Sequence, residues 1–352
     1  MSDHYYRGID TPSGEPELPL PLEPKLRESS GYIPSEGLMA AVDVALLLGQ
    51  PLLLTGDPGT GKTTLARAVA DKLFPGRYLE MQVKSTTSRT DLLYRIDELA
   101  RFRDSQTGHT KRLLDYAEFQ PLGLAILRAC GPGAPLYDRA GRQKLSGTDR
   151  SLSEVFGGDL PARDLQVGDL LNNPPDWTKP ERYVVLIDEI DKAPRDTPND
   201  LLEEFERMNF AIPELGVKVQ PPKEAPRPVV IVTSNSEKSL PDAFLRRCAF
   251  HNIAFPTDKE LRQIIERRLG IEITADSPRL ERMLKLFAAL REPGRLLKPP
   301  STSELLSLLH LMKDHQASNW PDKVIQYLSV IVKQPEDQRN AAATIDAWKA
   351  DQ

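Results

Sequence analysis

The sequence contains few of the residues that build disulfide frameworks or zinc sites. Among its 352 residues, the only cysteines are Cys130 and Cys248, and there are five histidines. These residues are scattered along the chain, so no disulfide framework and no metal-ligand spacing can be recognised. We therefore expect a protein of a reducing compartment that holds no structural zinc.

The sequence also lacks an excess of positive charge and a long hydrophobic run. Lys and Arg number 46 against 51 Asp and Glu, a formal net charge of −5. This balance argues against a general binder of nucleic acid or membrane surfaces, although a local basic groove stays possible. The most apolar stretch, residues 37–49, is too short to span a bilayer and contains Asp43. With no signal-peptide pattern at the start of the chain, we expect a cytoplasmic protein without membrane insertion.

A glycine-rich segment at residues 55–66, "TGDPGTGKTTLA", predicts a phosphate-binding loop. It lies between an apolar run, 51–54, and a helical pattern over about 62–73, which is the context that such a loop requires. The glycines let backbone N–H groups surround an anion, and the helix N-terminus adds its positive dipole end. Lys62 would contact the outer phosphates and Thr63 would coordinate Mg²⁺. The predicted nucleotide-binding residues here are Gly56, Asp57, Pro58, Gly59, Thr60, Gly61, Lys62, Thr63 and Thr64.

Two carboxylates follow the apolar run "YVVLI" at residues 183–187. Asp188 is predicted to hold Mg²⁺ through its water shell, as the acidic residue after such a strand does in P-loop enzymes. Glu189 is the candidate base for an attacking water molecule. The alternative is a solvated acidic turn.

Three further residues are candidates for the chemistry. Asn235 follows the apolar run 229–233, where its amide could contact the γ-phosphate and the attacking water, or simply form a turn. Arg246 and Arg247 follow a helix-like stretch and precede a strand. An arginine offered to the γ-phosphate of a neighbouring subunit would accelerate hydrolysis, whereas the alternative is a surface pair. We favour Arg247 because it lies closer to the strand.

The pattern of elements predicts an α/β fold with a parallel five-stranded sheet and a C-terminal all-helical domain. Short, unalternating apolar runs are typical of strands that are covered on both faces. They occur at 51–55, 78–83, 183–187, 229–233 and 251–255. The chain is expected to divide into a proline-rich tail at 1–30, a nucleotide-binding core at 31–256 and helices at 257–352, with runs near 258–269, 278–291, 301–316 and 322–333.

Two segments interrupt the alternation of strands and helices. Residues 131–180 contain "GPGAP", "GG" and "NNPPDW" with little periodicity, and we expect a long surface insertion there. Residues 206–228 contain "NFAIPELGVKVQ", which predicts a short hairpin that turns at 214–216.

Together these segments resemble the AAA+ ATPases. "GDPGTGKT" resembles Walker A, "VVLIDE" resembles Walker B, Asn235 matches the sensor-1 position, and the Arg246 and Arg247 pair resembles an arginine finger. The resemblance covers about residues 32–330. More narrowly, the chain resembles the MoxR branch through "GYIPSEGLMAAVDVALLLGQPLLLTGDPGTGKTTLA", "KSTTSRTDLLYRIDELARFRD", "FQPLGLAIL", "LIDEIDKAPRDTPNDLLEEFE" and "KPPSTSELL".

This resemblance implies a P-loop AAA+ core that binds ATP and Mg²⁺, with Tyr32 and Ile33 at the nucleotide. It implies hairpin inserts at about 102–118 and 208–220 and a helical lid. It also implies a chaperone-like ATPase that forms a ring, commonly a hexamer, and that remodels or activates a client, often one with a von Willebrand factor A domain. At the family's sensor-2 position this chain has Ser303, so nucleotide sensing by the lid would be weak or would use Arg295 or Lys298.

Two other functions remain possible from the sequence. A nucleic-acid-linked motor or restriction-type NTPase would share the same core, but the acidic charge and the lack of a base-reading domain oppose it. A nucleotide-gated scaffold with little turnover is opposed by the complete set of Lys62, Asp188 and Glu189. The client, the ring size and the role of 131–180 cannot be read from the sequence.

Overall fold

The computed structural model describes two compact units. One comprises Tyr32–Thr257, and the other comprises Met1–Gly31 with Asp258–Gln352. The structure describes residues 28–108, 111–157, 160, 162–172, 174, 176–270, 278–312 and 320–350. Most of the proline-rich segment at 1–30 therefore lies outside the described residues, apart from a 3₁₀ turn, η1, at Ser29–Gly31.

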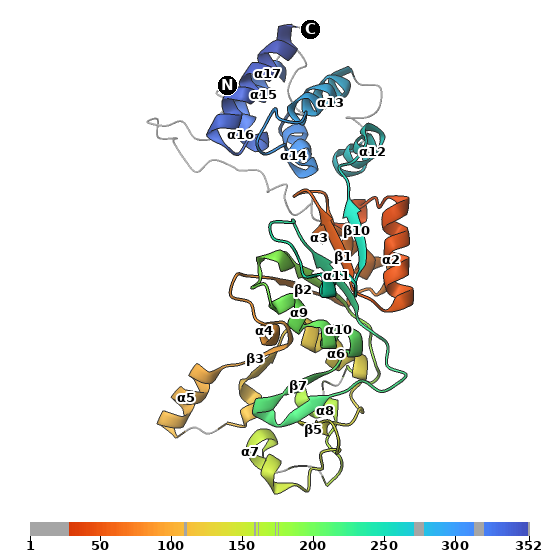
Figure 1. The fold of residues 1–352 in the computed structure, drawn as a ribbon, viewed down its shortest axis with the longest axis vertical. Helices are drawn as coiled ribbons and strands as arrows, with labels where there is room; N and C mark the ends of the chain where they lie inside the picture. Colours follow the sequence, from red (N-terminus) through yellow and green to blue (C-terminus); the bar gives the residue numbers. More distant parts are fainter. Residues whose placement is uncertain are drawn as a thin grey trace, which may run out of the picture. The chain divides into compact units, whose positions relative to one another are not determined.

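A five-stranded parallel sheet forms the centre of the first unit (Figure 1). The strand order β10-β1-β9-β6-β2 places the two strands that end in Asp188 and Thr233 side by side. The predicted α/β class is thus confirmed, and each strand lies within two residues of its predicted range. The strands are β1 (Leu52–Gly56), β2 (Tyr78–Gln82), β6 (Val184–Asp188), β9 (Val229–Thr233) and β10 (Ala249–Ile253).

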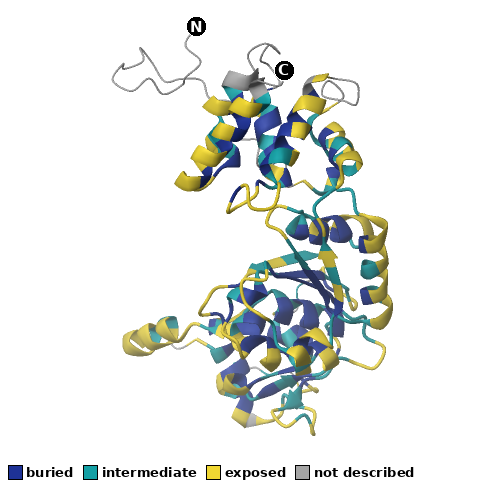
Figure 2. Ribbon diagram, turned by 45° about the horizontal axis from the view of Figure 1, so that its top comes forward, coloured by how far each residue is buried: buried dark blue, intermediate teal, exposed yellow. Residues whose placement is uncertain are grey.

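The apolar runs of the three central strands, β1, β9 and β6, lack alternation because both of their faces are buried, whereas the outer strands β2 and β10 are largely half-buried or exposed (Figure 2). Leu53, Val185 and Val230 pack into one hydrophobic cluster. Their strand neighbours Leu54 and Leu186 point to the other face and pack into a second cluster. Helix α6 (Pro121–Cys130) contributes to the first cluster, while α2 (Glu36–Leu48) and α3 (Lys62–Leu73) contribute to the second.

Residues 131–180 are not a surface insertion, and this expectation is corrected. The elements in the described part of this segment are short: β5 (Tyr137–Asp138), η3 (Arg150–Leu152), α7 (Ser153–Phe156) and α8 (Val167–Leu170). Their apolar side chains nevertheless join the larger core cluster, among them Leu136, Leu165 and Trp177. The Pro and Gly residues break the segment into pieces too short to show a period, which is why its burial could not be read from the pattern.

The insert expected at 102–118 has a helical tip rather than strands. A short antiparallel pair, β3 (Tyr94–Ile96) with β4 (Ala117–Phe119), brackets α5 (Glu98–Thr107) and η2 (Leu113–Tyr116). None of the α5 residues is buried, and the helix is drawn in yellow and teal in Figure 2. We call residues 94–119, from β3 to β4, the arm. The short helix α4 (Arg89–Leu93) precedes it.

A hairpin follows β6 and its connecting turns. Strands β7 (Phe210–Ile212) and β8 (Val217–Val219) are antiparallel and are joined by η5 (Pro213–Leu215) and Gly216, whose φ is 68°. Strand β5 extends this small sheet beside β8. Short helical turns connect β6 of the main sheet to β7: η4 (Ile190–Lys192), α9 (Thr197–Asp200) and α10 (Leu202–Arg207). Another short helix, α11 (Asp242–Leu245), connects β9 to β10.

In the second unit, the described residues from Asp258 onward form helices and no strand. A buried carboxylate, Asp337, accepts the backbone N–H groups of Leu297 (2.8 Å) and Lys298 (3.1 Å) and so ties the loop before α14 to α17. The last helix lies within the region 257–352 that is expected to be helical, although no separate run was predicted for it. The helices are α12 (Asp258–Leu269), α13 (Pro278–Leu290), α14 (Thr302–Met312), α15 (Trp320–Gln326), α16 (Leu328–Ile331) and α17 (Pro335–Ala350). Across the described part of the chain, the helices are too short or too polar to cross a membrane.

Candidate active site

The turn between β1 and α3 has a backbone that only glycine adopts readily. Gly56, Gly59 and Gly61 have φ values of 134°, 76° and 90°. A Cβ atom on Gly56 would lie 2.4 Å from the carbonyl oxygen of Ile253, and one on Gly61 would lie 2.8 Å from the ring of Tyr32. The backbone N–H groups of the turn are therefore not covered by Cβ atoms at these glycines, and they lie next to the N-terminus of a 12-residue helix. This arrangement suits a bound phosphate.

Lys62 is buried at the base of this turn, with 7% of its surface exposed. Its Nζ donates hydrogen bonds to the carbonyl oxygens of Gly56 (2.7 Å) and Asp57 (3.1 Å). Burial lowers the pKa of Lys62 from its ordinary value, although nearby carboxylates, Asp188 first among them, oppose this. The side chain thus carries its charge inside the turn, held only by neutral carbonyl groups that an anionic ligand could replace.

The other residues of the predicted loop surround this lysine. The Thr60 hydroxyl donates to the Asp57 carbonyl oxygen at 2.8 Å, and Thr64 lies half-buried in α3. Asp57, Pro58 and Gly59 are exposed at the tip. Tyr32 packs beside Gly61, and burial raises the pKa of its phenol. Ile33 follows it in the chain and is half-buried.

The candidate metal ligands lie together. The Thr63 hydroxyl is 3.3 Å from both carboxylate oxygens of Asp188, and the Thr233 hydroxyl donates to Asp188 Oδ1 at 2.5 Å. The pKa of Asp188 is raised above its ordinary value because burial outweighs the two hydroxyl donors, which lower it. One hydroxyl and one carboxylate fit Mg²⁺, which commonly takes few protein ligands and keeps water and phosphate oxygens.

Glu189 lies between the ends of three strands and uses both carboxylate oxygens. Its Oε1 accepts from Asn235 Nδ2 (2.9 Å), and its Oε2 accepts from Gln82 Nε2 (3.0 Å) and Lys192 Nζ (2.5 Å). Burial alone would raise the pKa of Glu189, but these three donors outweigh it and leave the pKa below its ordinary value. The group is therefore ionised at neutral pH and can accept a proton.

The backbone at Glu189 explains why its side chain diverges from that of Asp188. Its φ is 61°, a left-handed conformation that is uncommon outside glycine. The Glu189 N–H donates to the Thr233 hydroxyl at 2.9 Å, and the same hydroxyl donates to Asp188. Thr233 thus positions both carboxylates at once.

Sequence reasoning missed three of these polar neighbours: Gln82, Lys192 and Thr233. Gln82 and Thr233 are the last residues of β2 and β9, and the carboxyl ends of parallel strands meet at one edge of a sheet. That rule was applied to Asp188 and Asn235 and could have found these two as well. Lys192 lies three residues after Glu189 in η4, a turn that leaves no signal in the pattern.

The structure does not bring the two candidate arginines to this site. Both lie between α11 and β10, and β10 begins at Ala249, which pairs with Leu52 at the start of β1. The phosphate-binding turn follows Gly56, four residues further along β1, which is roughly 13 Å at about 3.3 Å per residue. Arg247 forms an ion pair with Glu206 and donates to the Ala243 carbonyl oxygen (3.0 Å), while Arg246 is exposed.

The candidate sensor-2 residues belong to the second unit. Ser303 lies in the first turn of α14, and its hydroxyl is 3.0 Å from that of Ser301. Arg295 pairs with Glu292 at 2.6 Å. The backbone N–H of Lys298 is bound by Asp337, as described above.

Of the comparisons with known proteins, the one with protein families identifies a family for this chain. A search of curated proteins found no match to the sequence. Among solved structures, the chain is similar to "Crystal structure of a putative ATPase from Cytophaga hutchinsonii ATCC 33406", with 15% identity over 92% of this chain and 85% of that one. The TM-score is 0.35, so we draw no conclusion from this similarity. The family described as "AAA domain (dynein-related subfamily)" matches residues 51–248, which contain the whole of β1, β6 and β9 with the loops that follow them. Because this match covers more than half of the sequence, the chain belongs to the AAA domain family.

Proposed function

We propose that this chain is a MoxR-like AAA+ ATPase that hydrolyses ATP with Mg²⁺ at sites shared between the subunits of a ring. The observation that carries the proposal is the grouping of Lys62, the Thr63 and Asp188 pair, and Glu189 at one edge of the sheet. Each element of phosphoryl transfer to water has a candidate there: a cation for the phosphates, ligands for a metal ion, and a base.

The roles follow from the contacts. Lys62 would exchange the Gly56 and Asp57 carbonyl oxygens for the outer phosphate oxygens, and Thr63 and Asp188 would hold Mg²⁺. The metal ion, when bound, supplies positive charge against the phosphates. Glu189 would accept the proton of the attacking water at Oε1, where the hydrogen bond from Asn235 leaves a second lone pair. Asn235, beside it, would orient that water.

A second subunit would complete the site. The distance along β1 separates Arg247 from the phosphate-binding turn of its own chain, and its guanidinium lies near the surface beside Glu206. If Arg247 serves a neighbouring copy instead, each contact is head-to-tail, and such contacts close into a ring when their rotation permits. We propose a homo-oligomer, a hexamer by the MoxR resemblance.

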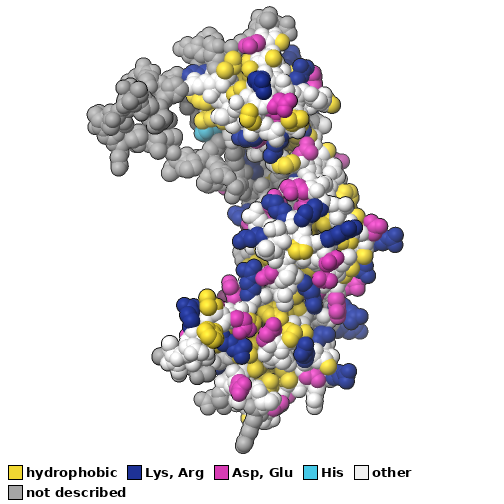
Figure 3. All heavy atoms as spheres, turned by 60° about the vertical axis from the view of Figure 1, so that its left-hand side comes forward, with side chains coloured by type: hydrophobic (Ala, Val, Ile, Leu, Met, Phe, Trp, Pro, Cys, Tyr) yellow, Lys and Arg dark blue, Asp and Glu magenta, His cyan; other side chains and the backbone are white. Residues whose placement is uncertain are grey.

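The partner that we propose is a client protein, with a von Willebrand factor A domain by the same resemblance, in the cytoplasm. ATP binding and hydrolysis would switch the arrangement of the subunits and move the exposed arm α5 and the β7–β8 hairpin against it. On the face drawn in Figure 3, basic, acidic and apolar side chains are intermixed, which offers no continuous basic track for a nucleic acid.

The shared site is tested by substituting the candidate finger. We expect Arg247→Ala to bind ATP normally and to lose about 10³-fold or more in turnover, because charge on the transferred phosphoryl group is no longer neutralised. Arg246→Ala is the matched comparison and should stay near the wild-type rate. Both are measured as ATPase rate and as affinity for a fluorescent ATP analogue.

Mixing two inactive variants gives the decisive result. Glu189→Gln subunits retain Arg247 and should restore hydrolysis to Arg247→Ala subunits, which retain Glu189. A mixture no more active than its two components would end the shared-site proposal. If Arg246→Ala loses ATP turnover while Arg247→Ala keeps it, Arg246 is the arginine finger.

A further inference from the structure

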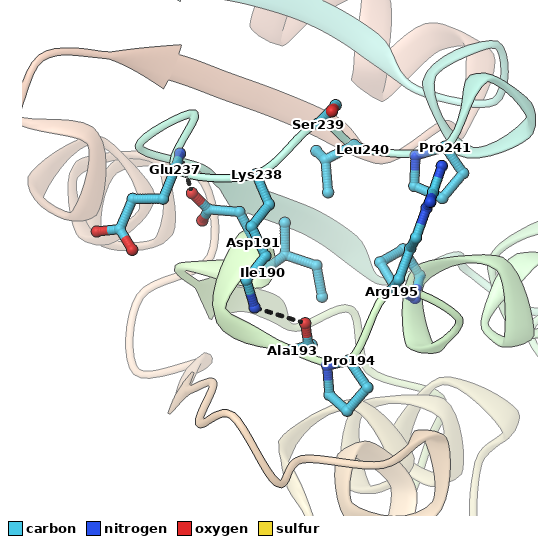
Figure 4. A pocket seen from close by; sticks show the side chains of 11 residues that line it. Ile190, Asp191, Ala193, Pro194, Arg195, Glu237, Lys238, Ser239, Leu240 and Pro241 are labelled. Carbon is cyan, nitrogen blue, oxygen red and sulfur yellow. Dashed lines mark hydrogen bonds between the residues drawn. The ribbon is translucent and has the colours of Figure 1, made fainter.

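Two loops that leave the neighbouring strands β6 and β9 hold each other through reciprocal hydrogen bonds. From the first loop, Asp191 Oδ2 accepts the backbone N–H groups of Asn235 (3.2 Å) and Glu237 (2.9 Å). From the second, Lys238 Nζ donates to the carbonyl oxygens of Lys192 (3.2 Å) and Ala193 (3.4 Å). Figure 4 shows one bond of each kind. We call this pair of interactions, made by Asp191 and Lys238, the clasp.

The two residues of the clasp differ in burial: Asp191 lies in the core, whereas Lys238 is exposed. Asp191 is 3% exposed, and its Oδ1 has no hydrogen-bond partner in the described part of the chain. Burial of a charged group with one oxygen unsatisfied is unfavourable for stability. We therefore explain Asp191 by the conformation that it gives to the second loop and not by a gain in stability.

That geometry is a strained one. Ser236, between the two amides that Asp191 binds, has a φ of 61°, and its own N–H donates to the Ser234 hydroxyl at 3.0 Å. Three successive backbone N–H groups, 235 to 237, are therefore bound by side chains. A left-handed residue at this point persists only where its surroundings hold it.

Packing alone does not hold the second loop. A hollow of about 400 Å³, open to solvent, lies between the two loops and is lined by residues of both, including Ile190, Pro194, Leu240 and Pro241 (Figure 4). Close-packed side chains would fix the loop without hydrogen bonds, but a hollow of this size leaves it room to shift. The clasp is thus a restraint on where Asn235 stands, because Asp191 binds its backbone N–H directly.

Asn235 is the residue that this restraint serves, because its Nδ2 donates to Glu189 Oε1 at 2.9 Å. We propose that Asp191 and Lys238 are positioning residues that keep the Asn235 amide in register with Glu189 for hydrolysis. This inference rests on the proposed ATPase function. Displacement of a catalytic group by about 1 Å can lower a rate by about 100-fold, so a loosened clasp should have a large effect.

Asp191 is tested with two substitutions, one that keeps an acceptor oxygen and one that removes it. Asp191→Asn keeps an acceptor oxygen for both N–H groups, places a donor where the unpartnered Oδ1 stands, and should retain kcat within about threefold. Asp191→Ala removes the acceptor and should lower kcat by about 100-fold, with the affinity for an ATP analogue and the unfolding temperature little changed. An Asp191→Asn protein that is folded but as slow as Asp191→Ala would overturn the proposal.

A double-variant comparison separates positioning from a general weakening of the fold. If Asp191 acts through Asn235, then Asp191→Ala should lower kcat hardly at all in an Asn235→Ala background. Equal losses in both backgrounds would contradict it. Should Asp191→Ala fail to fold, exposed Lys238→Met replaces it in both backgrounds, with an expected tenfold loss that vanishes without Asn235. Lys223→Met, in the exposed loop at the other end of β9, is the matched control and should change neither rate.

Hydrogen exchange tests the clasp without any ATPase assay. In the full chain, the amides of Asn235 and Glu237 should exchange at least about tenfold faster in Asp191→Ala than in the wild type or in Asp191→Asn. Unchanged exchange means that the clasp does not hold this loop, whatever the activity. A wild-type chain that hydrolyses no ATP would instead overturn the proposed function and with it the catalytic role of the clasp, even where the exchange result stands.

Discussion

Replacement of Lys62 by alanine is expected to abolish measurable ATP binding. The Lys62 ammonium is buried inside the phosphate-binding turn, and its present partners are two neutral carbonyl oxygens. Exchange of these for phosphate oxygens forms hydrogen bonds between charged groups, each worth about 1.5–3 kcal/mol. Loss of two such bonds corresponds to two to four orders of magnitude in Kd, because each 1.4 kcal/mol is about tenfold.

The measurement is a titration with a fluorescent ATP analogue, followed at the same time by the unfolding temperature. Lys72→Ala provides the control, since Lys72 is exposed at the other end of the same helix and should leave both quantities unchanged. ATP binding within a few-fold of the wild type in a folded Lys62→Ala protein would remove this turn as the nucleotide site.

Glu189→Gln is expected to bind ATP as the wild type does and to hydrolyse it 10² to 10⁴ times more slowly, which is about the contribution of a general base. Glutamine is similar in shape and keeps an acceptor oxygen for Asn235, but its amide cannot take the proton of water. Because the hydrogen bonds around Glu189 hold its pKa below the ordinary value, the wild-type group is already ionised at neutral pH. The loss should therefore be seen at pH 7 without any change of protonation.

Single-turnover hydrolysis and analogue binding are measured on the same preparation. Glu224→Gln is the control, because Glu224 is exposed in the loop that precedes β9 at the opposite end of the sheet. Turnover close to that of the wild type in Glu189→Gln would exclude Glu189 as the base and would direct attention to the other polar groups at this edge.

Much of the fold could be predicted because its three central strands are buried on both faces. The run "VVIVT" at 229–233 predicts a strand because it is short, rich in β-branched residues and followed by turn formers. The phosphate-binding turn was equally clear, since glycine spacing, Lys62 and Thr63 are local in sequence. For the same reason, the sequence alone predicts that Asp188 and Glu189 lie at the carboxyl end of a strand.

What could not be predicted depends on which elements become neighbours. The contacts of Gln82 and Thr233 with the two carboxylates require the order β9-β6-β2, which no local pattern encodes. Residues 131–180 were misread because segments of four residues show no period, although they bury Leu136 and Trp177. The clasp was missed for a related reason, since its hydrogen bonds join two irregular loops.

The central claim is that one chain alone has an incomplete site, and the ATPase rate per subunit as a function of protein concentration tests it most directly. Particle mass is measured in parallel, with and without ATP. We predict a rate that rises steeply over the same concentration range in which a ring of about six subunits assembles. A rate per subunit that stays constant while the protein remains a monomer would contradict the account.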